Sequence, residues 1–134
     1  MLRKRPHPNL AQYQGCIVSR GRVDGLCFTH YPQSLTSLLN PGHLNKGLRH
    51  LHSLGFIHND LNPANIMITE EDIPVIIDFD SATAPGASLQ NVKRTHGWFD
   101  HRIVVSQQSN DLDALAEIRT WLTGSSPYEY RFDL

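Results

Sequence analysis

The feature that most constrains the fold of this chain is a polar segment, residues 58–65, between an apolar helical pattern and two short apolar runs. Leucines recur at helical spacing over residues 44–54 and Gly55 follows as a left-handed stop, which predicts an amphipathic helix. Residues 65–69 and 75–79 are rich in β-formers and flank an acidic turn, which predicts two antiparallel strands. If these strands form a hairpin, the polar segment and the residues after the second strand are brought together.

The stretch before this helix predicts a β-hairpin and a short helix. Residues 16–18 and 26–28 favour strands, and residues 19–25 between them contain two glycines suited to a reversing turn. Ser34 can cap a short helix over residues 35–39, because its hydroxyl can accept a hydrogen bond from a free N–H of the first turn.

The second half of the chain predicts a long loop and one more helix. Residues 81–109 have little periodicity and contain Pro and Gly, so we expect a loop, and loops of this length are usually functional or mobile. A helix is expected over residues 112–122, with Asn110 or Asp111 as its N-cap and Gly124 as its stop. Apolar residues cover much of its circumference, which predicts burial on several sides.

Composition limits the classes of function. The 134 residues carry 12 Lys and Arg against 13 Asp and Glu, so no excess positive charge is left for nucleic-acid phosphates. No apolar run approaches the roughly 18 residues of a membrane span, and none follows the N-terminus as a secretory signal requires. Cys16 and Cys27 form neither a zinc-type pair nor a disulfide framework. We therefore expect one soluble, intracellular domain, cytoplasmic or nuclear, without a nucleic-acid or membrane partner.

Three oxygen-bearing side chains carry the chemistry of the polar segment and its neighbour. Asp60 and Asn65 lie in the segment, and Asp78 follows the second predicted strand. Carboxylate and amide oxygens suit Mg²⁺, which takes one or two protein carboxylates and completes its shell with water and phosphate oxygens. Each of these residue types is also common in turns. Together they indicate a magnesium-phosphate site with a carboxylate that can accept a proton.

The same residues resemble the eukaryotic protein kinases. His58-Asn59-Asp60-Leu61 with Asn65 is similar to the catalytic-loop motif H-R-D-L-x-x-x-N. Asp78-Phe79-Asp80 is similar to the metal-binding motif D-F-G, and residues 94–98 resemble the end of an activation segment. Residues 110–115 resemble the start of the central hydrophobic helix.

The resemblance implies the fold class and the division of the chain. The fold would be α+β, a protein-kinase-like C-terminal lobe that is mainly helical with short β-hairpins, beside an incomplete N-terminal lobe. Residues 1–31 would form the end of the N-terminal lobe and the hinge, and residues 32–134 an incomplete C-terminal lobe.

The resemblance also implies two cofactors, ATP and Mg²⁺, and a role for each residue of the catalytic corner. Asp60 would accept the proton of an attacking Ser or Thr hydroxyl. His58 would brace the catalytic loop, and Thr95 would hydrogen-bond near Asp60. Asn65 and Asp78 would hold Mg²⁺.

The nucleotide would lie against the hinge. By the resemblance, the backbone of Thr29 and Tyr31 would contact adenine, Met67 would lie under the base and Phe28 would limit the depth of the pocket. Asp111 would bind the backbone of the catalytic loop.

Several residues depart from the kinase pattern. No G-x-G-x-x-G loop occurs in the sequence, and none of Lys4, Lys46 and Lys93 follows a strand of the V-A-I type. Asn59 replaces the arginine that elsewhere pairs with a phosphorylated loop, and an amide cannot form that charged, bidentate contact. Asn62 stands where serine/threonine kinases usually have lysine. We expect weak catalysis by this chain alone.

Three functions stay open. The first is a serine/threonine protein kinase acting on a protein substrate. The second is a pseudokinase-type module that binds a nucleotide, or a partner protein covering its exposed helical surface. The third is a small-molecule phosphotransferase of the aminoglycoside or choline kinase kind, whose motifs look similar. A metal pair of His50 and His52 is disfavoured, because residues two apart point to different faces of a helix.

Overall fold

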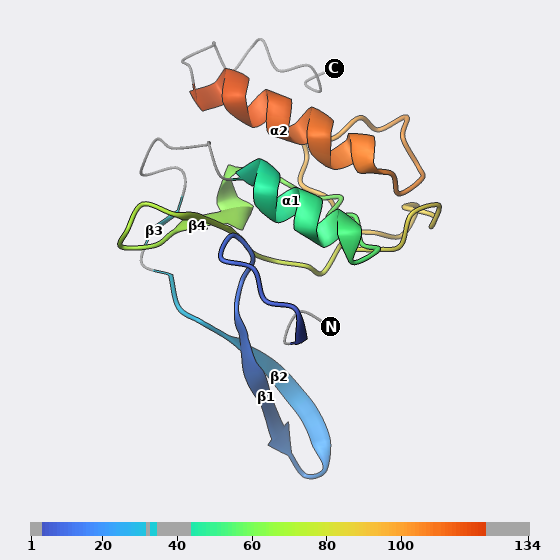
Figure 1. Cartoon of the computed structure of the whole chain (residues 1–134). Helices are drawn as coiled ribbons and strands as arrows, with labels where there is room; N and C mark the ends of the chain where they lie inside the picture. Colours follow the sequence, from blue (N-terminus) through green and yellow to red (C-terminus); the bar gives the residue numbers. More distant parts are fainter. Residues whose placement is uncertain (1–3, 32, 35–43, 123–134) are drawn as a thin grey trace.

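The computed structural model describes residues 4–31, 33–34 and 44–122. Two helices lie one above the other over a small sheet, and a two-stranded hairpin projects away from this body (Figure 1). The helix expected over residues 35–39 and the stop expected at Gly124 lie outside the described residues. Within the described part of the chain, the helices are too short and too polar for any of them to cross a membrane.

The projecting hairpin consists of β1 (Tyr13–Ser19) and β2 (Arg22–Phe28), which pair antiparallel and confirm the predicted hairpin. Its turn is shorter than expected. Ser19 pairs with Arg22, so only Arg20 and Gly21 lie between the strands, and both have a positive φ, of 49° and 75°. Positive φ at both positions is the geometry of the two-residue turn whose twist matches that of the strands.

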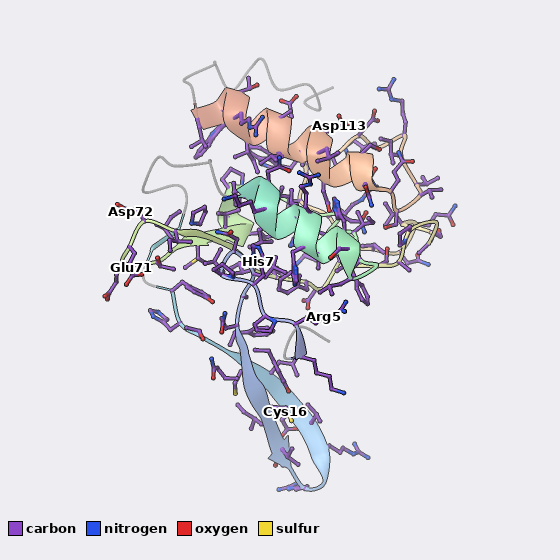
Figure 2. All side chains as sticks on the ribbon, viewed as in Figure 1. Arg5, His7, Cys16, Glu71, Asp72 and Asp113 are labelled. Carbon is purple, nitrogen blue, oxygen red and sulfur yellow. The ribbon has the colours of Figure 1, made fainter. Side chains whose placement is uncertain are left out.

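The β1–β2 hairpin, on which Figure 2 labels Cys16, carries several solvent-exposed apolar side chains. The exposed apolar side chains are Ile17, Val18, Val23 and Leu26, each 57–62% accessible. The largest exposed apolar surface of the described residues therefore lies on this hairpin rather than on a helix.

Helix α1 (Leu44–Ser53) confirms the predicted amphipathic helix and its stop. Leu44, Leu48 and Leu51 are buried on one face. Gly55 has a φ of +83°, and its N–H donates to the carbonyl of His52 (3.0 Å) while Phe56 N–H donates to that of Leu51 (3.3 Å). This pair of bonds is the Schellman motif, in which a left-handed glycine satisfies the last carbonyls of a helix.

The small sheet has the order β3–β4–β5, formed by β3 (Gln33–Ser34), β4 (Ile66–Ile68) and β5 (Pro74–Ile76). The antiparallel pairing of β4 with β5 confirms the second predicted hairpin, while β3 was not expected. β4 and β5 each contain three residues, fewer than the five predicted for each strand. The first begins after a 3-10 turn over Pro63–Asn65, and the second ends before Asp78, whose left-handed φ of 57° cannot continue a strand.

Helix α2 (Gln108–Leu122) begins four residues before the predicted start, so Asn110 and Asp111 lie in its first turn and neither is the N-cap. The predicted burial on several sides is also wrong. Ala114, Leu115 and Ile118 are buried, but Leu112 is 46% exposed. The preceding residues, 81–107, form no helix or strand element, which confirms the predicted long loop.

The core joins both helices to the sheet. It is formed by buried residues of α1, β4, β5 and α2 together with Leu10, which bridges to Ile76 in parallel. Gly47 lets the N-terminal segment approach α1, because an added Cβ there would lie 2.9 Å from the carbonyl oxygen of Asn9. The polar segment predicted to be functional therefore lies between the end of α1 and the sheet.

Candidate active site

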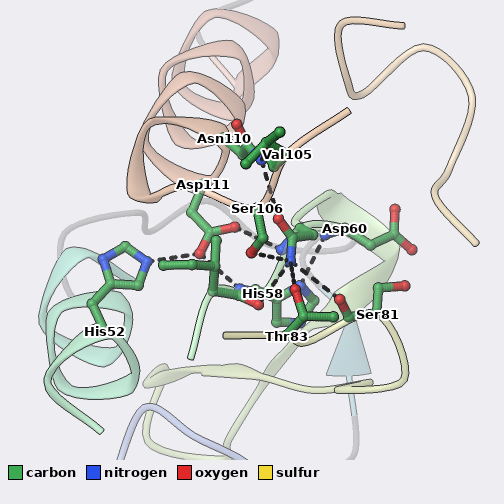
Figure 3. A network of polar contacts seen from close by, with 11 residues as sticks. His52, His58, Asp60, Ser81, Thr83, Val105, Ser106, Asn110 and Asp111 are labelled. Atoms are coloured by element: carbon green, nitrogen blue, oxygen red, sulfur yellow. Dashed lines mark hydrogen bonds and ion pairs between the residues drawn. The ribbon is translucent and has the colours of Figure 1, made fainter. Parts of the chain in front are cut away.

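The polar segment is held by a buried carboxylate on α2. Asp111 is 0% exposed, and its two oxygens accept hydrogen bonds from the backbone N–H groups of His58 and Asn59, both at 2.9 Å. His52 Nε2, on α1, lies 2.7 Å from the same carboxylate (Figure 3). The structure thus places Asp111 on the backbone of the catalytic-loop segment, as the sequence predicted, and adds His52 as a partner.

His58 ties this segment to the residues before Asp78. Its side chain is fully buried, its Nε2 lies 2.9 Å from the carbonyl oxygen of Ile77, and its Nδ1 accepts from the N–H of Asp60 at 3.3 Å. Since a carbonyl can only accept and an amide N–H can only donate, these partners assign the proton to Nε2. The neutral ring therefore braces the loop from both sides.

The Asp60 carboxylate is oriented by neutral donors. Thr95 donates to it twice, from its backbone N–H to Oδ1 (2.6 Å) and from its hydroxyl to Oδ2 (3.1 Å). Asn65 Nδ2 donates to Oδ2 at 3.3 Å. Asp60 is half-buried, so the carboxylate retains contact with solvent. Such a carboxylate is fixed in direction and can accept a proton from a group that approaches from the open side.

Two asparagine side chains build the turn around Asp60. Asn62 and Asn65 both donate to the Asp60 carbonyl, at 3.0 and 2.9 Å. Asn62 also accepts from the N–H of Ala64 (2.9 Å) and donates to the Thr95 hydroxyl (3.1 Å). Asn62 stands at the position expected for lysine, and here its amide acts as the cap of the 3-10 turn and as a support for Thr95.

Asn65 and Asp78 supply the oxygen atoms expected for a cation. The Asn65 amide nitrogen is directed at Asp60, which leaves its Oδ1 as an acceptor. Its carbonyl accepts from the N–H of Ile77 at 3.0 Å, so its backbone lies beside the residue that precedes Asp78. Asp78 is exposed, and its Oδ1 accepts from the nearby N–H of Asp80, at 3.3 Å. One carboxylate and one amide oxygen on neighbouring backbones fit Mg²⁺.

A cavity of about 480 Å³ opens on the hinge side of Asp78. The three residues predicted to bind the base, Thr29, Tyr31 and Met67, all line it, and so do Phe28 and Asp78. The lining is mostly apolar, as expected for a small-molecule pocket with a few polar groups at defined places. Asp60 and Asn65 are not among its lining residues.

One backbone group of the predicted hinge is already hydrogen-bonded within the chain. The N–H of Thr29 donates to the Gln12 carbonyl at 2.9 Å. The backbone group of Thr29 that could bind a nucleotide base is therefore its carbonyl oxygen. The Tyr31 hydroxyl accepts from the Gln12 N–H at 3.1 Å, which fixes the ring against the end of the hairpin. The two predicted hinge residues therefore hold their places through the same neighbour.

Arg94 is a cation close enough to Asp60 to interact with its charge. Burial lowers the pKa of its guanidinium, and the negative charges of Asp60 and Asp100 act in the opposite direction. Its Nη2 donates to the Ile103 carbonyl at 2.9 Å, and its guanidinium lies 4.0 Å from the centre of the Phe99 ring. These contacts of Arg94 hold the loop segment that contains its neighbour Thr95.

The predicted residues form two groups in space. Asp60, His58 and Thr95 belong to one hydrogen-bonded network, and Thr29, Tyr31, Met67 and Asp78 border one cavity. Asn65 connects the groups, because its side chain bonds Asp60 and its carbonyl bonds the residue before Asp78.

Sequence reasoning missed two residues, His52 and the side chain of Asn59. His52 contacts Asp111, 59 positions away, and Asn59 contacts Ser106 and Asn110, 47 and 51 positions away, so no local pattern could reveal these contacts. In the part of the chain that the structure describes, no group of three or more His, Cys, Asp or Glu side chains could hold a metal ion.

Comparisons with known proteins identify the family of this chain. Residues 39–129, more than half of the chain, match the model of the protein kinase domain. The chain is similar to the serine/threonine-protein kinase SSK22 of Saccharomyces cerevisiae, with 33% identity over 65% of this chain and 8% of that protein. It is also similar to the serine/threonine-protein kinase Tao of Drosophila melanogaster, with 26% identity over 92% of this chain and 13% of that protein.

The fold is similar to that of a solved kinase. The structure of the Cydia pomonella granulovirus kinase PK-1 matches 99% of this chain with a TM-score of 0.75 and 19% identity. The chain spans 54% of that kinase, and it spans much smaller shares of the longer relatives. The α+β fold with its short antiparallel pairs is thus a partial kinase fold. The chain belongs to the protein kinase domain family.

Proposed function

We propose that this chain carries the catalytic and metal corner of a serine/threonine protein kinase, which transfers the γ-phosphoryl group of ATP to a hydroxyl. The observation that supports this most directly is the position of Asn65. Its side chain bonds Asp60 and its carbonyl bonds Ile77, so the proposed base and the proposed metal ligand Asp78 share one support. The division at residues 1–31 and 32–134, the former ending at the hinge, is part of the same proposal.

ATP would bind in the cavity with its base between the hinge and Met67. Thr29 would offer its carbonyl and Tyr31 its backbone to the base, while the apolar lining excludes water. Asn65 and Asp78 would hold Mg²⁺, which when bound neutralises charge on the β- and γ-phosphates. Asp78 supports this role because it lines the cavity while the left-handed φ of 57° ends the β5 segment before it.

Asp60 would act as the base. Its carboxylate accepts the proton of the attacking hydroxyl as the new oxygen–phosphorus bond forms and the bond between the β- and γ-phosphates breaks, leaving ADP. Thr95 and Asn65 keep the carboxylate in one orientation throughout, since each donates to it from a fixed position. Preorganised donors of this kind do not need to rearrange during the reaction.

A second candidate is a module that binds a nucleotide or a partner protein without transfer. The hydrogen bonds of Asp60 favour this candidate. Its carboxylate oxygens already accept three hydrogen bonds from Thr95 and Asn65, which makes them less available to accept a proton from a substrate hydroxyl. Asn62 in place of lysine also leaves the corner without a cation aimed at the transferred phosphoryl group. The exposed apolar face of the β1–β2 hairpin is the surface on which such a partner would dock.

The test is a comparison of Mg-ATP binding and phosphotransfer in three variants. We expect Asp78→Asn to weaken Mg-ATP binding about tenfold or more by thermal shift, and Asp60→Asn to preserve binding but abolish transfer of labelled phosphate to Ser/Thr peptides. Asp72→Asn is the matched control, because Asp72 is exposed and also has a left-handed φ, of 61° against 57° for Asp78.

Each other outcome selects a different function. Binding that depends on Asp78 without any transfer supports the binding module. Transfer to aminoglycosides or choline in place of peptides supports the small-molecule phosphotransferase. A melting curve that does not respond to millimolar Mg-ATP rejects the protein kinase, the small-molecule phosphotransferase and the nucleotide-binding form of the module, and leaves only binding of a partner protein.

A further inference from the structure

The side chain of Asn59 is hydrogen-bonded within a buried network, whose members Ser81, Ser106 and Asn110 are labelled in Figure 3. Asn59 is 4% exposed, and its Oδ1 accepts from Asn110 Nδ2 on α2 at 3.1 Å. Its Nδ2 faces four oxygens, those of the Ile57 carbonyl at 3.0 Å, the Ser106 hydroxyl at 3.0 Å, the Ser81 carbonyl at 3.2 Å and the Thr83 hydroxyl at 3.3 Å. Two N–H groups are therefore shared among four acceptors, and the amide is fully used.

Three of these four acceptors belong to the two ends of the long loop, Ser81 and Thr83 to its start and Ser106 to its end. Thr83 pairs with Ile57 through two backbone hydrogen bonds of 2.8 and 3.0 Å, which places the start of the loop beside the residues before Asn59. Ser106 exchanges backbone hydrogen bonds with Gly86 and Ala87, both at 2.8 Å, so the end of the loop returns to its start. The Asn59 amide lies where these two ends meet.

The middle of the same loop carries Thr95, which orients Asp60. Ser81, whose carbonyl accepts from Asn59, donates its hydroxyl to the Lys93 carbonyl, two residues before Thr95. A shift of the loop ends would therefore reach Thr95 through Lys93. The orientation of the Asp60 carboxylate thus depends on the position of Thr95 in the loop. The position of the loop depends in turn on its hydrogen bonds to Asn59, the residue before Asp60.

The chemistry of the site explains why an amide is suited to it. The acceptors around Asn59 are two carbonyls and two hydroxyls, all neutral, so a buried cation would find no negative partner among them. A neutral amide supplies the donors without that cost. Asn59 also has a φ of 65°, a left-handed conformation that asparagine tolerates better than most residues.

We propose that Asn59 is a positioning residue that holds the loop of residues 81–106 on the catalytic segment by neutral hydrogen bonds, so that Thr95 reaches Asp60 without a phosphate on the loop. The arginine expected at this position pairs with an added phosphate. In this chain the loop supplies the acceptors itself. The placement of the loop is independent of activity, whereas its effect on the reaction rests on the proposed function.

The first test is amide hydrogen exchange by mass spectrometry on Asn59→Asp. This variant has the same size and tolerates the same φ, but it loses both N–H donors and places a carboxylate among four acceptors. We expect exchange in residues 81–106 to become at least tenfold faster, with α1 and β4–β5 unchanged. Asn91→Asp is the matched control, since it introduces the same charge at an exposed position of the same loop and should change nothing.

A uniform increase over the whole chain, or no increase in the loop, would overturn the proposal. If Asn59→Asp does not fold, Ser106→Ala removes one acceptor from the opposite side and should accelerate exchange in the same amides, by a smaller factor. No change in that variant would overturn the proposal equally.

The second test concerns phosphate. Protein shown by intact mass to carry no phosphate should protect residues 81–106 as fully as the untreated protein, and loop protection that disappears on phosphatase treatment contradicts the inference. In an active chain, Asn59→Asp should lower kcat about tenfold and leave the KM for ATP unchanged, because the nucleotide cavity does not include Asn59. An inactive chain leaves the exchange result valid, so failure of the proposed function and failure of this inference are distinguishable.

Discussion

His52 Nε2 and Asp111 Oδ2 lie 2.7 Å apart, with 7% and 0% of their side chains exposed, and this contact joins α1 to α2. The same carboxylate accepts from the N–H groups of His58 and Asn59. An ionised carboxylate can only accept, so His52 Nε2 carries a proton in this contact. One buried group therefore links two helices to the catalytic-loop segment, and its loss would leave several donors without partners.

Replacing Asp111 should destabilise the chain strongly. Asp111→Ala leaves the N–H groups of His58 and Asn59 and the ring of His52 without their acceptor, and breaking a buried pair in this way costs about 3–5 kcal/mol. Asp111→Asn keeps one acceptor oxygen and should cost about 1–3 kcal/mol. Urea unfolding measures both, and Asp72→Asn, at an exposed position of the β4–β5 turn, serves as a control (Figure 2). Equal losses in the two Asp111 variants would contradict this account.

The Thr95 hydroxyl should affect rate without affecting nucleotide binding. Thr95→Val removes the bond to Asp60 Oδ2 and the acceptor for Asn62, so the carboxylate loses part of its orientation. Misplacement of a reacting group by about 1 Å can cost roughly 100-fold in rate, and we expect kcat for phosphotransfer to fall about 10- to 100-fold. Thr95→Ser keeps the hydroxyl and should retain most of the rate. A fall in Mg-ATP affinity in Thr95→Val would count against this role.

Gly47 should not tolerate a side chain. A Cβ at this position would lie 2.9 Å from both the Cβ and the carbonyl oxygen of Asn9, and that carbonyl accepts from the N–H of Ile76. Overpacking of this kind costs about 1–3 kcal/mol, against the roughly 1 kcal/mol that alanine gains over glycine inside a helix.

We therefore expect Gly47→Ala to lower the free energy of unfolding, measured in urea. Gly25→Ala is the control, because its Cβ would meet only Ile17, at an ordinary 3.7 Å. A more stable Gly47→Ala protein would show that the N-terminal segment does not pack against α1 as described.

Protonation of His7 should destabilise the fold in mild acid. Burial lowers its pKa below the ordinary value of 6.5, and the positive charges of His50 and Lys46 lower it further. A histidine whose pKa is depressed by folding binds its proton more readily in the unfolded chain, so its contribution is present above pH 6.5 and is lost as the pH falls through the folded pKa.

The melting temperature should therefore fall between pH 7 and pH 5, and less steeply in His7→Gln, which keeps an acceptor for the N–H of Asn9. His30→Gln, at an exposed position, should leave the slope unchanged. If the melting temperature falls equally with pH in the parent and in His7→Gln, protonation of His7 does not affect the stability of the fold.

Local patterns in the sequence were sufficient for the elements and for the order of the motifs. The leucine spacing and Gly55 define α1 and its end, because helix periodicity and a left-handed stop are properties of neighbouring residues. The alternation of apolar runs and turns likewise predicted both hairpins. The motif around Asp60 and Asp78 predicted a single corner, whereas the structure has a hydrogen-bonded network around Asp60 and a cavity bordered by Asp78, with Asn65 between them.

Tertiary structure decided what each polar side chain does. Asp111 was expected either to cap a helix or to bind the catalytic loop, and only the packing of α2 against α1 directs its carboxylate at His58. In the sequence, Asn59 was interpreted only as a replacement of the arginine of the kinase pattern. In the structure its side chain makes hydrogen bonds to Ser81, Ser106 and Asn110. The physical reason is that a helix or turn is specified by residues a few positions apart, whereas a buried hydrogen bond is specified by two segments that meet only after the chain has folded.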